Sequence, residues 1–166
     1  MKAAVMKLAD DQMLLFCIGT SHSLQKGLRN APQGCYAEFQ LMVRQAAQHH
    51  SVRTIAEEMS EEALGDAVSL CAEVAAELAI SHLFCDLNRA EREALGLPVE
   101  DCLSTWSGRE VEWLNRLKRV TFPVLFVCGA KHVDSFAEKW SARGGTVKVL
   151  DGDWAPTKPI PLEYSL

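Results

Sequence analysis

The run Met13-Leu-Leu-Phe-Cys-Ile18 is continuously apolar and stops at Gly19. A run of this kind predicts a strand that is buried on both faces of a sheet. Pro123-Val-Leu-Phe-Val-Cys128 has the same form and again stops at a glycine, Gly129. Strands buried on both faces are typical of parallel sheets that helices cover on each side, so the two runs favour an α/β fold.

Helical and strand-like patterns alternate along the rest of the chain. Short strands are expected at 52–56, 83–85 and 146–150. Apolar residues recur at helical spacing in the segments 36–46, 64–78, 113–117 and 133–140, and a brief helix is expected at 88–95. This alternation predicts a single domain over residues 1–166, with a three-layer α/β/α fold and a mostly parallel sheet of about five strands. The proline-containing tail, residues 151–166, is expected to lie along the surface.

Two serines have the pattern of helix N-caps. Ser60 precedes two glutamates that suit the positive end of a helix dipole, so one long helix is expected to follow it as far as residue 78. Ser107 and Glu110 have the spacing of a capping box. That box would place Arg109 in the first helical turn, where a cation opposes the dipole, so a carboxylate or an anionic substrate is expected as its partner.

The composition is that of an ordinary globular protein, with 48% hydrophobic and 23% charged residues and a formal net charge of -5. No basic patch is visible, so no nucleic-acid partner is expected. No apolar run approaches the roughly 20 residues that span a bilayer, and the N-terminal residues lack the pattern of a signal peptide. No membrane partner is therefore expected, and the expected location is the cytoplasm. The six cysteines include no CxxC pair and are expected to be free thiols.

Polar residues follow each expected strand, at the edge where an open parallel sheet binds its ligands. They are Gly19-Thr-Ser-His22 after the first strand, Glu57 and Glu58 after the second, Asp86 after the third, and Gly129-Ala-Lys-His132 after the fourth. Imidazoles and carboxylates are the groups that bind zinc, manganese or iron, or that carry out acid–base chemistry. The sequence therefore predicts a site of this kind at the carboxyl ends of the strands.

Each of these residues also has a purely structural interpretation. His22 is compatible with a surface loop, His132 with a turn, and Asp86 with a cap on the helix that follows it. A capping box by itself would account for Glu110. Strand alternation would send the two adjacent glutamates to opposite faces, provided that the second strand extends that far. The histidines expected to be structural are His49, His50 and His82.

The form Gly-x-x-His occurs twice, at Gly19 to His22 and at Gly129 to His132, each time directly after a buried strand. The glycine would let the chain turn sharply, so that the histidine points back over the sheet edge. Together with Glu57 or Glu58 and the pair Arg109-Glu110, this pattern resembles the superfamily that joins TraB/PrgY proteins, Tiki Wnt-inactivating proteases, erythromycin esterases and ChaN haem-binding lipoproteins. The resemblance spans residues 14–150. It implies an α/β fold and, as in the protease branch, hydrolysis that depends on a divalent metal.

The leading functional prediction is a metal-dependent hydrolase of the esterase or peptidase kind, acting on a small-molecule or peptide substrate. The metal, expected to be manganese, zinc, cobalt or iron, would be held by His22, His132 and Glu57 and would lower the pKa of a bound water. The expected catalytic residues are Glu57, Glu58, Arg109 and Glu110, with one glutamate accepting a proton and the arginine facing the oxyanion. The expected ligand-binding residues are Gly19, Ser21, Asp86 and Gly129.

Three alternatives stay open at this point. His22 could act as a general base on water without a metal, as the erythromycin esterase branch suggests. The same edge could bind a small ligand or haem, with His22 or His132 as the axial ligand, as in ChaN-like proteins. An interaction module could retain the fold without the chemistry.

Overall fold

The structure, a computed structural model, describes residues 13–26, 33–98 and 103–156. In this part of the chain five strands form one sheet in the order β3-β2-β4-β1-β5. The strands are β1 (Leu14–Thr20), β2 (Thr54–Glu57), β3 (Ser81–Phe84), β4 (Val124–Gly129) and β5 (Thr146–Asp151). Every adjacent pair is parallel, as the sequence predicts, and Gly19 of β1 lies opposite Cys128 of β4.

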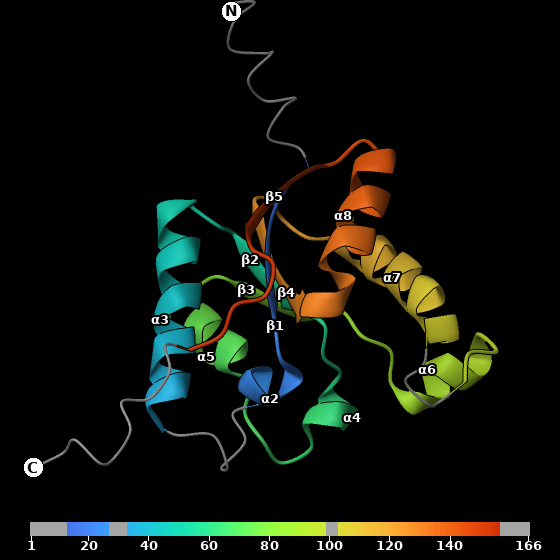
Figure 1. Ribbon diagram of the computed structural model, residues 1–166, viewed down its shortest axis with the longest axis horizontal. Coiled ribbons are helices and arrows are strands. Elements are labelled where there is room, and N and C mark those ends of the chain that lie inside the picture. Colours follow the sequence, from blue (N-terminus) through green and yellow to red (C-terminus); the bar gives the residue numbers. More distant parts are fainter. Residues whose placement is uncertain (1–12, 27–32, 99–102, 157–166) are drawn as a thin grey trace, which may run out of the picture.

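Helices cover both faces of the sheet (Figure 1). On one face lie α3 (Gln33–His49) and α5 (Leu70–Glu77), and on the other lie α7 (Leu103–Leu117) and α8 (Val133–Ala142). The shorter elements are α2 (His22–Gln25), α4 (Glu61–Leu64), α6 (Arg89–Ala94) and the 3₁₀ turn η1 (Ala130–His132), which precedes α8. The predicted α/β architecture, with helices on both faces of a parallel sheet, is confirmed.

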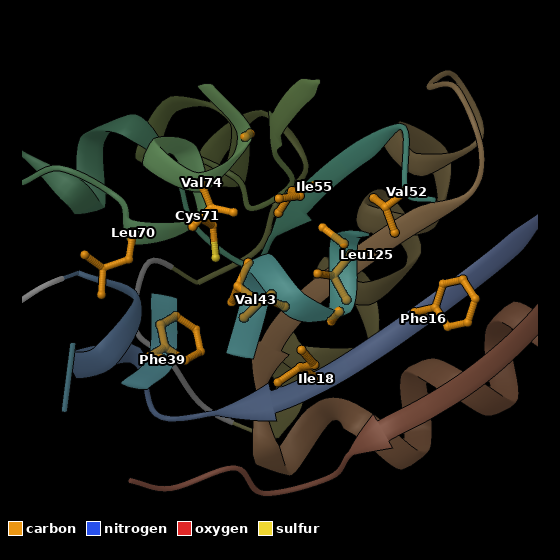
Figure 2. Close-up of a cluster of buried hydrophobic side chains, with 14 of the residues drawn as sticks. Phe16, Ile18, Phe39, Val43, Val52, Ile55, Leu70, Cys71, Val74 and Leu125 are labelled. Atoms are coloured by element: carbon orange, nitrogen blue, oxygen red, sulfur yellow. The ribbon is translucent and has the colours of Figure 1, made fainter. Parts of the chain in front are cut away.

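Two apolar clusters form the core, one on each face of the sheet. Phe16 and Ile18 of β1 pack with side chains of α3 and α5, and Figure 2 shows this cluster. Leu15 and Cys17 belong to the other cluster, with side chains of α7 and α8. Because successive side chains of a strand alternate between the two faces, both sets must be apolar, which explains the uninterrupted apolar run in β1.

The described residues show the state of five cysteines and whether any of the described helices could cross a membrane. Five cysteines lie in this part of the chain, and all five are free thiols that lie buried. Cys102 lies outside the described residues, as do residues 157–166 of the predicted surface tail. Among the helices that are described, none is both long enough and apolar enough to cross a membrane.

The single helix predicted from Ser60 to residue 78 is two helices in the structure. Ser60 caps α4 as predicted, because its hydroxyl accepts a hydrogen bond from the backbone N–H of Ala63 at 3.1 Å. The chain leaves the helix at Gly65, where φ is +59°, and α5 begins after a second N-cap, Ser69. Glycine adopts a positive φ at little cost, so Gly65 ends the first helix although the apolar spacing continues.

The capping box predicted at 107–110 is wrong, because α7 already begins at Leu103. Arg109 consequently lies inside the helix, and its expected conflict with the dipole of the first turn does not arise. A capping box does form at the start of α6. There the Asn88 side chain accepts a hydrogen bond from the backbone N–H of Glu91, and the Glu91 carboxylate accepts one from the backbone N–H of Asn88.

The order of the strands creates a crevice between the carboxyl ends of β1 and β4. The two strands are neighbours, yet the chain leaves β1 toward α3 on one face and leaves β4 toward α8 on the other (Figure 1). In open parallel sheets, ligands bind where adjacent connections diverge in this way. Both Gly-x-x-His segments, 19–22 and 129–132, therefore start from the same crevice.

The segment after β5 crosses the carboxyl end of β1. The backbone N–H of Trp154 donates to the carbonyl oxygen of Gly19 at 2.7 Å, and the Thr20 hydroxyl donates to the carbonyl oxygen of Trp154 at 3.0 Å. The two segments are so close that a Cβ on Gly19 would lie 2.2 Å from the carbonyl oxygen of Gly152 and 2.5 Å from a methyl carbon of Val133. Lack of space therefore requires the glycine at position 19.

We expect Gly19→Ala to lower the free energy of unfolding by about 1–3 kcal/mol, because the added methyl group overlaps backbone that must shift to admit it. Chemical denaturation of the purified variant measures the change. Gly152→Ala is the matched control, since a Cβ there meets no atom within 4 Å, and it should change the stability by no more than about 0.5 kcal/mol. Equal losses in the two variants would contradict this explanation.

Candidate functional site

The carboxylate of Glu58 lies at the centre of the crevice, directly after β2, and its side chain is fully buried. Its Oε2 accepts a hydrogen bond from the backbone N–H of Gly129 at 2.7 Å, and its Oε1 accepts one from Nη2 of Arg109 at 2.8 Å. The Nε2 atoms of His22 and His132 lie 3.6 and 3.5 Å from the same Oε1. The structure thus brings the two motif histidines together at one buried carboxylate.

Glu57 points to the opposite face of the sheet, as alternation along a strand requires. Its Oε1 accepts a hydrogen bond from the Ser69 hydroxyl and lies 2.8 Å from Nε2 of His82, while its Oε2 has no partner among the described residues. The prediction that Glu57 joins the two motif histidines is therefore wrong, and Glu58 takes that position. His82, expected to be structural, binds this second carboxylate.

His132 is held by a carboxylate of α7. Its Nδ1 lies 2.8 Å from Oε1 of Glu110, which also accepts a hydrogen bond from the Ser135 hydroxyl at 2.6 Å. The other oxygen of Glu110 binds Nζ of Lys139. Because an ionised carboxylate only accepts hydrogen bonds, Nδ1 of His132 carries a proton, and Nε2 presents a lone pair when the ring is neutral. Glu110 therefore orients His132.

Burial and hydrogen bonding act in opposite directions on the carboxylates of the site. Burial raises the pKa of Glu58, although the two histidines, a backbone N–H and a guanidinium act against it. Burial would also raise the pKa of Glu110, but its hydrogen bonds to the histidine, lysine and serine side chains outweigh this effect and lower the pKa to about 2. The pKa of Asp86 is likewise lowered, because arginine and tryptophan donors outweigh its burial. Of the three carboxyl groups, only Glu58 has a raised pKa, because burial outweighs the groups that act against it.

The guanidinium of Arg109 is buried and is paired with carboxylates of the protein. Its Nε and Nη2 donate to the two oxygens of Asp86 at 3.0 and 2.8 Å, and Nη2 also reaches Glu58. Asp86 further accepts hydrogen bonds from Nε1 of Trp113 at 3.1 Å and from Nη2 of Arg92 at 2.9 Å. Of the two partners predicted for Arg109, the structure thus contains the carboxylate. Asp86 orients Arg109 instead of capping the next helix.

Gly129 leaves the space in which the imidazoles and the carboxylate meet. A Cβ at this position would lie 3.2 Å from Oε2 of Glu58, 3.3 Å from Nε2 of His22 and 3.5 Å from Cδ2 of His132. The backbone of Gly129 is extended, with φ −60° and ψ 136°, so the sharp turn expected at this glycine does not occur. The glycine of the second motif therefore serves close approach rather than chain reversal.

A cavity of about 370 Å³ opens on this cluster. Its wall includes His22, His132, Ser21, Trp106, Lys131 and Asp153. The ring centroids of Trp106 and His132 lie 4.6 Å apart. The side chain of His22 is 43% exposed and that of His132 is 3% exposed, so His22 is the imidazole that a molecule in the cavity can reach.

The predicted ligand-binding residues divide into two groups. Ser21 and Gly129 line the cavity, whereas Gly19 is covered by the segment after β5 and Asp86 is bound to arginines. Asp86 instead borders a larger hollow of about 550 Å³ beside β3. Several acidic groups of that hollow already have partners, since Glu91 pairs with Arg116 at 2.8 Å and Glu62 accepts a hydrogen bond from the backbone N–H of Arg89 at 2.6 Å. The smaller cavity is the candidate site because both motif histidines line it.

The two histidines and Glu58 are ligands of the kind that hold a catalytic metal, but their arrangement is incomplete. Both oxygens of Glu58 already accept hydrogen bonds, from Arg109 and from Gly129. In the part of the chain that the structure describes, no three His, Cys, Asp or Glu side chains are grouped so that they could hold a metal ion. The metal site predicted from the sequence therefore stays a prediction.

Several contributors to the site escape prediction from the sequence, and those that hold the two histidines or their partners include Gln25, Ser135 and Lys139. Nδ1 of His22 lies 3.0 Å from Oε1 of Gln25. Helical spacing is the signal that could have revealed Gln25, Ser135 and Lys139, because residues three or four apart share one face of a helix. Gln25 follows His22 by three positions, and Ser135 and Lys139 follow His132 at helical spacing.

Comparison of the chain with protein-family models, with curated proteins and with solved structures finds no match. The resemblance to the superfamily of TraB, Tiki, erythromycin esterase and ChaN proteins therefore stays a prediction. The chemistry of the crevice is inferred from its own geometry.

Glu110→Gln tests the charge that holds His132. Because the folded-state pKa of about 2 lies below the ordinary value of 4.5, ionisation of Glu110 stabilises the fold above pH 4.5, and this contribution disappears as the pH falls through 2. We expect the wild type to be more stable than the variant by up to about 3 kcal/mol at pH 7 and by much less at pH 2. Urea denaturation at both pH values measures this.

Glu112→Gln is the matched control for this comparison, because Glu112 lies on the same helix but is more exposed. Its ion pair with Arg116 is expected to contribute no more than about 0.5 kcal/mol. A loss of stability in Glu110→Gln that is equal at pH 7 and at pH 2 would show that the charge of Glu110 is not what stabilises this anchor.

Proposed function

We propose that the chain is a hydrolase that uses His22 to activate water in the crevice between β1 and β4. One observation supports this most, namely that the Nε2 atoms of His22 and His132 both face Oε1 of Glu58, at 3.6 and 3.5 Å. These separations exceed the hydrogen-bond range of about 2.7–3.2 Å, so the imidazoles do not bond to the carboxylate directly. A water molecule that donates both of its hydrogens would satisfy two of these acceptors at once.

His22 is the proton acceptor in this proposal, because it is the imidazole exposed to the cavity. Its Nε2 takes a proton from water while the water oxygen adds to the acyl carbon of an ester or amide. The bond to the leaving group then breaks, and the leaving oxygen or nitrogen receives that proton from His22. The ionised carboxylate of Glu58, whose Oε1 lies 3.6 Å from Nε2 of His22, stabilises the protonated imidazole.

The oxyanion needs a partner other than Arg109, which is bound to Asp86 and Glu58. Lys131 lines the cavity, and its ammonium group is the cation that would stabilise the oxyanion. Arg109 instead holds Glu58 in place, and Glu110 holds His132. A cavity of about 370 Å³ is near the lower end of the usual range for ligand sites, which supports a small ester or amide as the substrate.

His22→Gln should lower kcat by about 10²–10⁴-fold for any small ester or amide that the wild type cleaves, because the proton acceptor is removed. A screen of chromogenic esters and anilides with purified protein identifies the substrate and measures kcat. His49→Gln is the matched control, since His49 is exposed at the end of α3, and its kcat should equal that of the wild type. Both variants should keep the thermal stability of the wild type.

A chelator distinguishes this chemistry from the metal-dependent form predicted from the sequence. We expect activity to survive exhaustive dialysis against EDTA. Loss of activity that manganese or zinc restores would mean that a metal carries the reaction. Absence of turnover, together with a haem Soret band that His22→Gln abolishes, would replace the hydrolase proposal with haem binding.

A further inference from the structure

Gln25 is a polar side chain in an unusual place. It is the last residue of α2, and it is completely buried, with 0% of its surface exposed. A buried amide destabilises the fold unless its donor and acceptor groups are hydrogen-bonded. The partners of Gln25 therefore indicate why an amide rather than an apolar side chain lies here.

The two ends of the Gln25 amide have partners of different kinds. Its Nε2 lies 3.2 Å from the carbonyl oxygen of Val127 in β4. A carbonyl oxygen only accepts hydrogen bonds, so the amide must turn its NH₂ group toward it. The backbone N–H of Glu58 donates to the same carbonyl oxygen at 2.8 Å. One oxygen atom of β4 thus positions both Gln25 and the central glutamate.

This orientation leaves the amide oxygen for His22. Oε1 of Gln25 lies 3.0 Å from Nδ1 of His22. An amide oxygen cannot donate, so Nδ1 must carry the proton. A neutral imidazole has one N–H, and Nε2 of His22 is then left with a free lone pair. That lone pair is on the nitrogen that lies 3.6 Å from Oε1 of Glu58.

We propose that Gln25 is a positioning residue that fixes His22 as the Nδ1–H tautomer, so that Nε2 is available to take the proton from water. This inference rests on the proposed function for its catalytic part, while the tautomer itself is independent of any reaction. The amide orients the imidazole without adding a charge beside Glu58. His132 differs, because the carboxylate of Glu110 holds its Nδ1.

The test is ¹⁵N NMR of the histidine side chains together with steady-state kinetics. In the wild type, His22 should give a protonated Nδ1 and an unprotonated Nε2. Gln25→Met has a similar length but forms neither hydrogen bond, so His22 should populate the Nε2–H tautomer while the His132 signals stay unchanged. For the substrate found in the screen, kcat should fall roughly 10–100-fold, as for other groups that orient a functional histidine, with KM unchanged.

Two further variants control for altered folding. Gln45→Met makes the same substitution at an exposed position of α3 and should match the wild type in both measurements. Gln25→Glu keeps an acceptor for Nδ1 of His22 and should retain the Nδ1–H tautomer even if its stability falls. This rescue separates the lost acceptor from general disruption of the core.

An Nε2–H tautomer in the wild type would overturn the proposal, as would unchanged histidine spectra in Gln25→Met. Both outcomes can be read without a substrate. A protein that shows the expected tautomers but cleaves none of the substrates tested would refute the hydrolase function and leave the positioning role of Gln25 intact.

Discussion

The burial of the Glu58 carboxylate is the constraint on which the rest of the site depends. An ionised carboxylate removed from water costs several kcal/mol unless it is paired and hydrogen-bonded. The Gly129 N–H and Arg109 offset that cost. Arg109 is itself buried and so requires Asp86, which in turn binds Arg92. One carboxylate thus explains why α7, the end of β4 and the segment after β3 meet at the end of β2.

Close packing around Gly129 is the second consequence of this burial. The absence of a side chain at Gly129 lets the carboxylate and the two imidazoles approach this backbone closely, since a Cβ there would lie 3.2 Å from Oε2 of Glu58. Gly19 is required for a different reason, because the segment after β5 passes so close to it that a side chain would not fit. The two Gly-x-x-His segments look alike in sequence and meet in one crevice because β1 and β4 are neighbours whose chains leave toward opposite faces. Their glycines nevertheless have separate roles.

The sequence predicts the sheet well because continuous apolar runs and helical spacing report burial directly. It fails where a local pattern has two meanings. The apolar spacing after Ser60 continues through Gly65, so the end of α4 depends on a backbone angle that spacing does not report. For the site, the sequence correctly predicts that the segments after β1, β2, β3 and β4 meet at the carboxyl ends of the strands. The choice between Glu57 and Glu58 depended on where β2 ends, and the partners of His22 depended on side-chain direction across separate elements.

The charges around the histidines balance, which bears on the chemistry that the site can perform. Three buried carboxylates, of Glu58, Asp86 and Glu110, face three cations, of Arg92, Arg109 and Lys139. The buried carboxylates are thus paired with arginine and lysine side chains and do not depend on the imidazoles for neutralisation. They differ in what holds them, because a carboxylate stabilises a positive charge on its partner, whereas an amide only orients it. The amide-bound ring of His22 faces the cavity, whereas the carboxylate-bound ring of His132 is almost completely buried, so His22 is the imidazole placed to contact a molecule in the cavity.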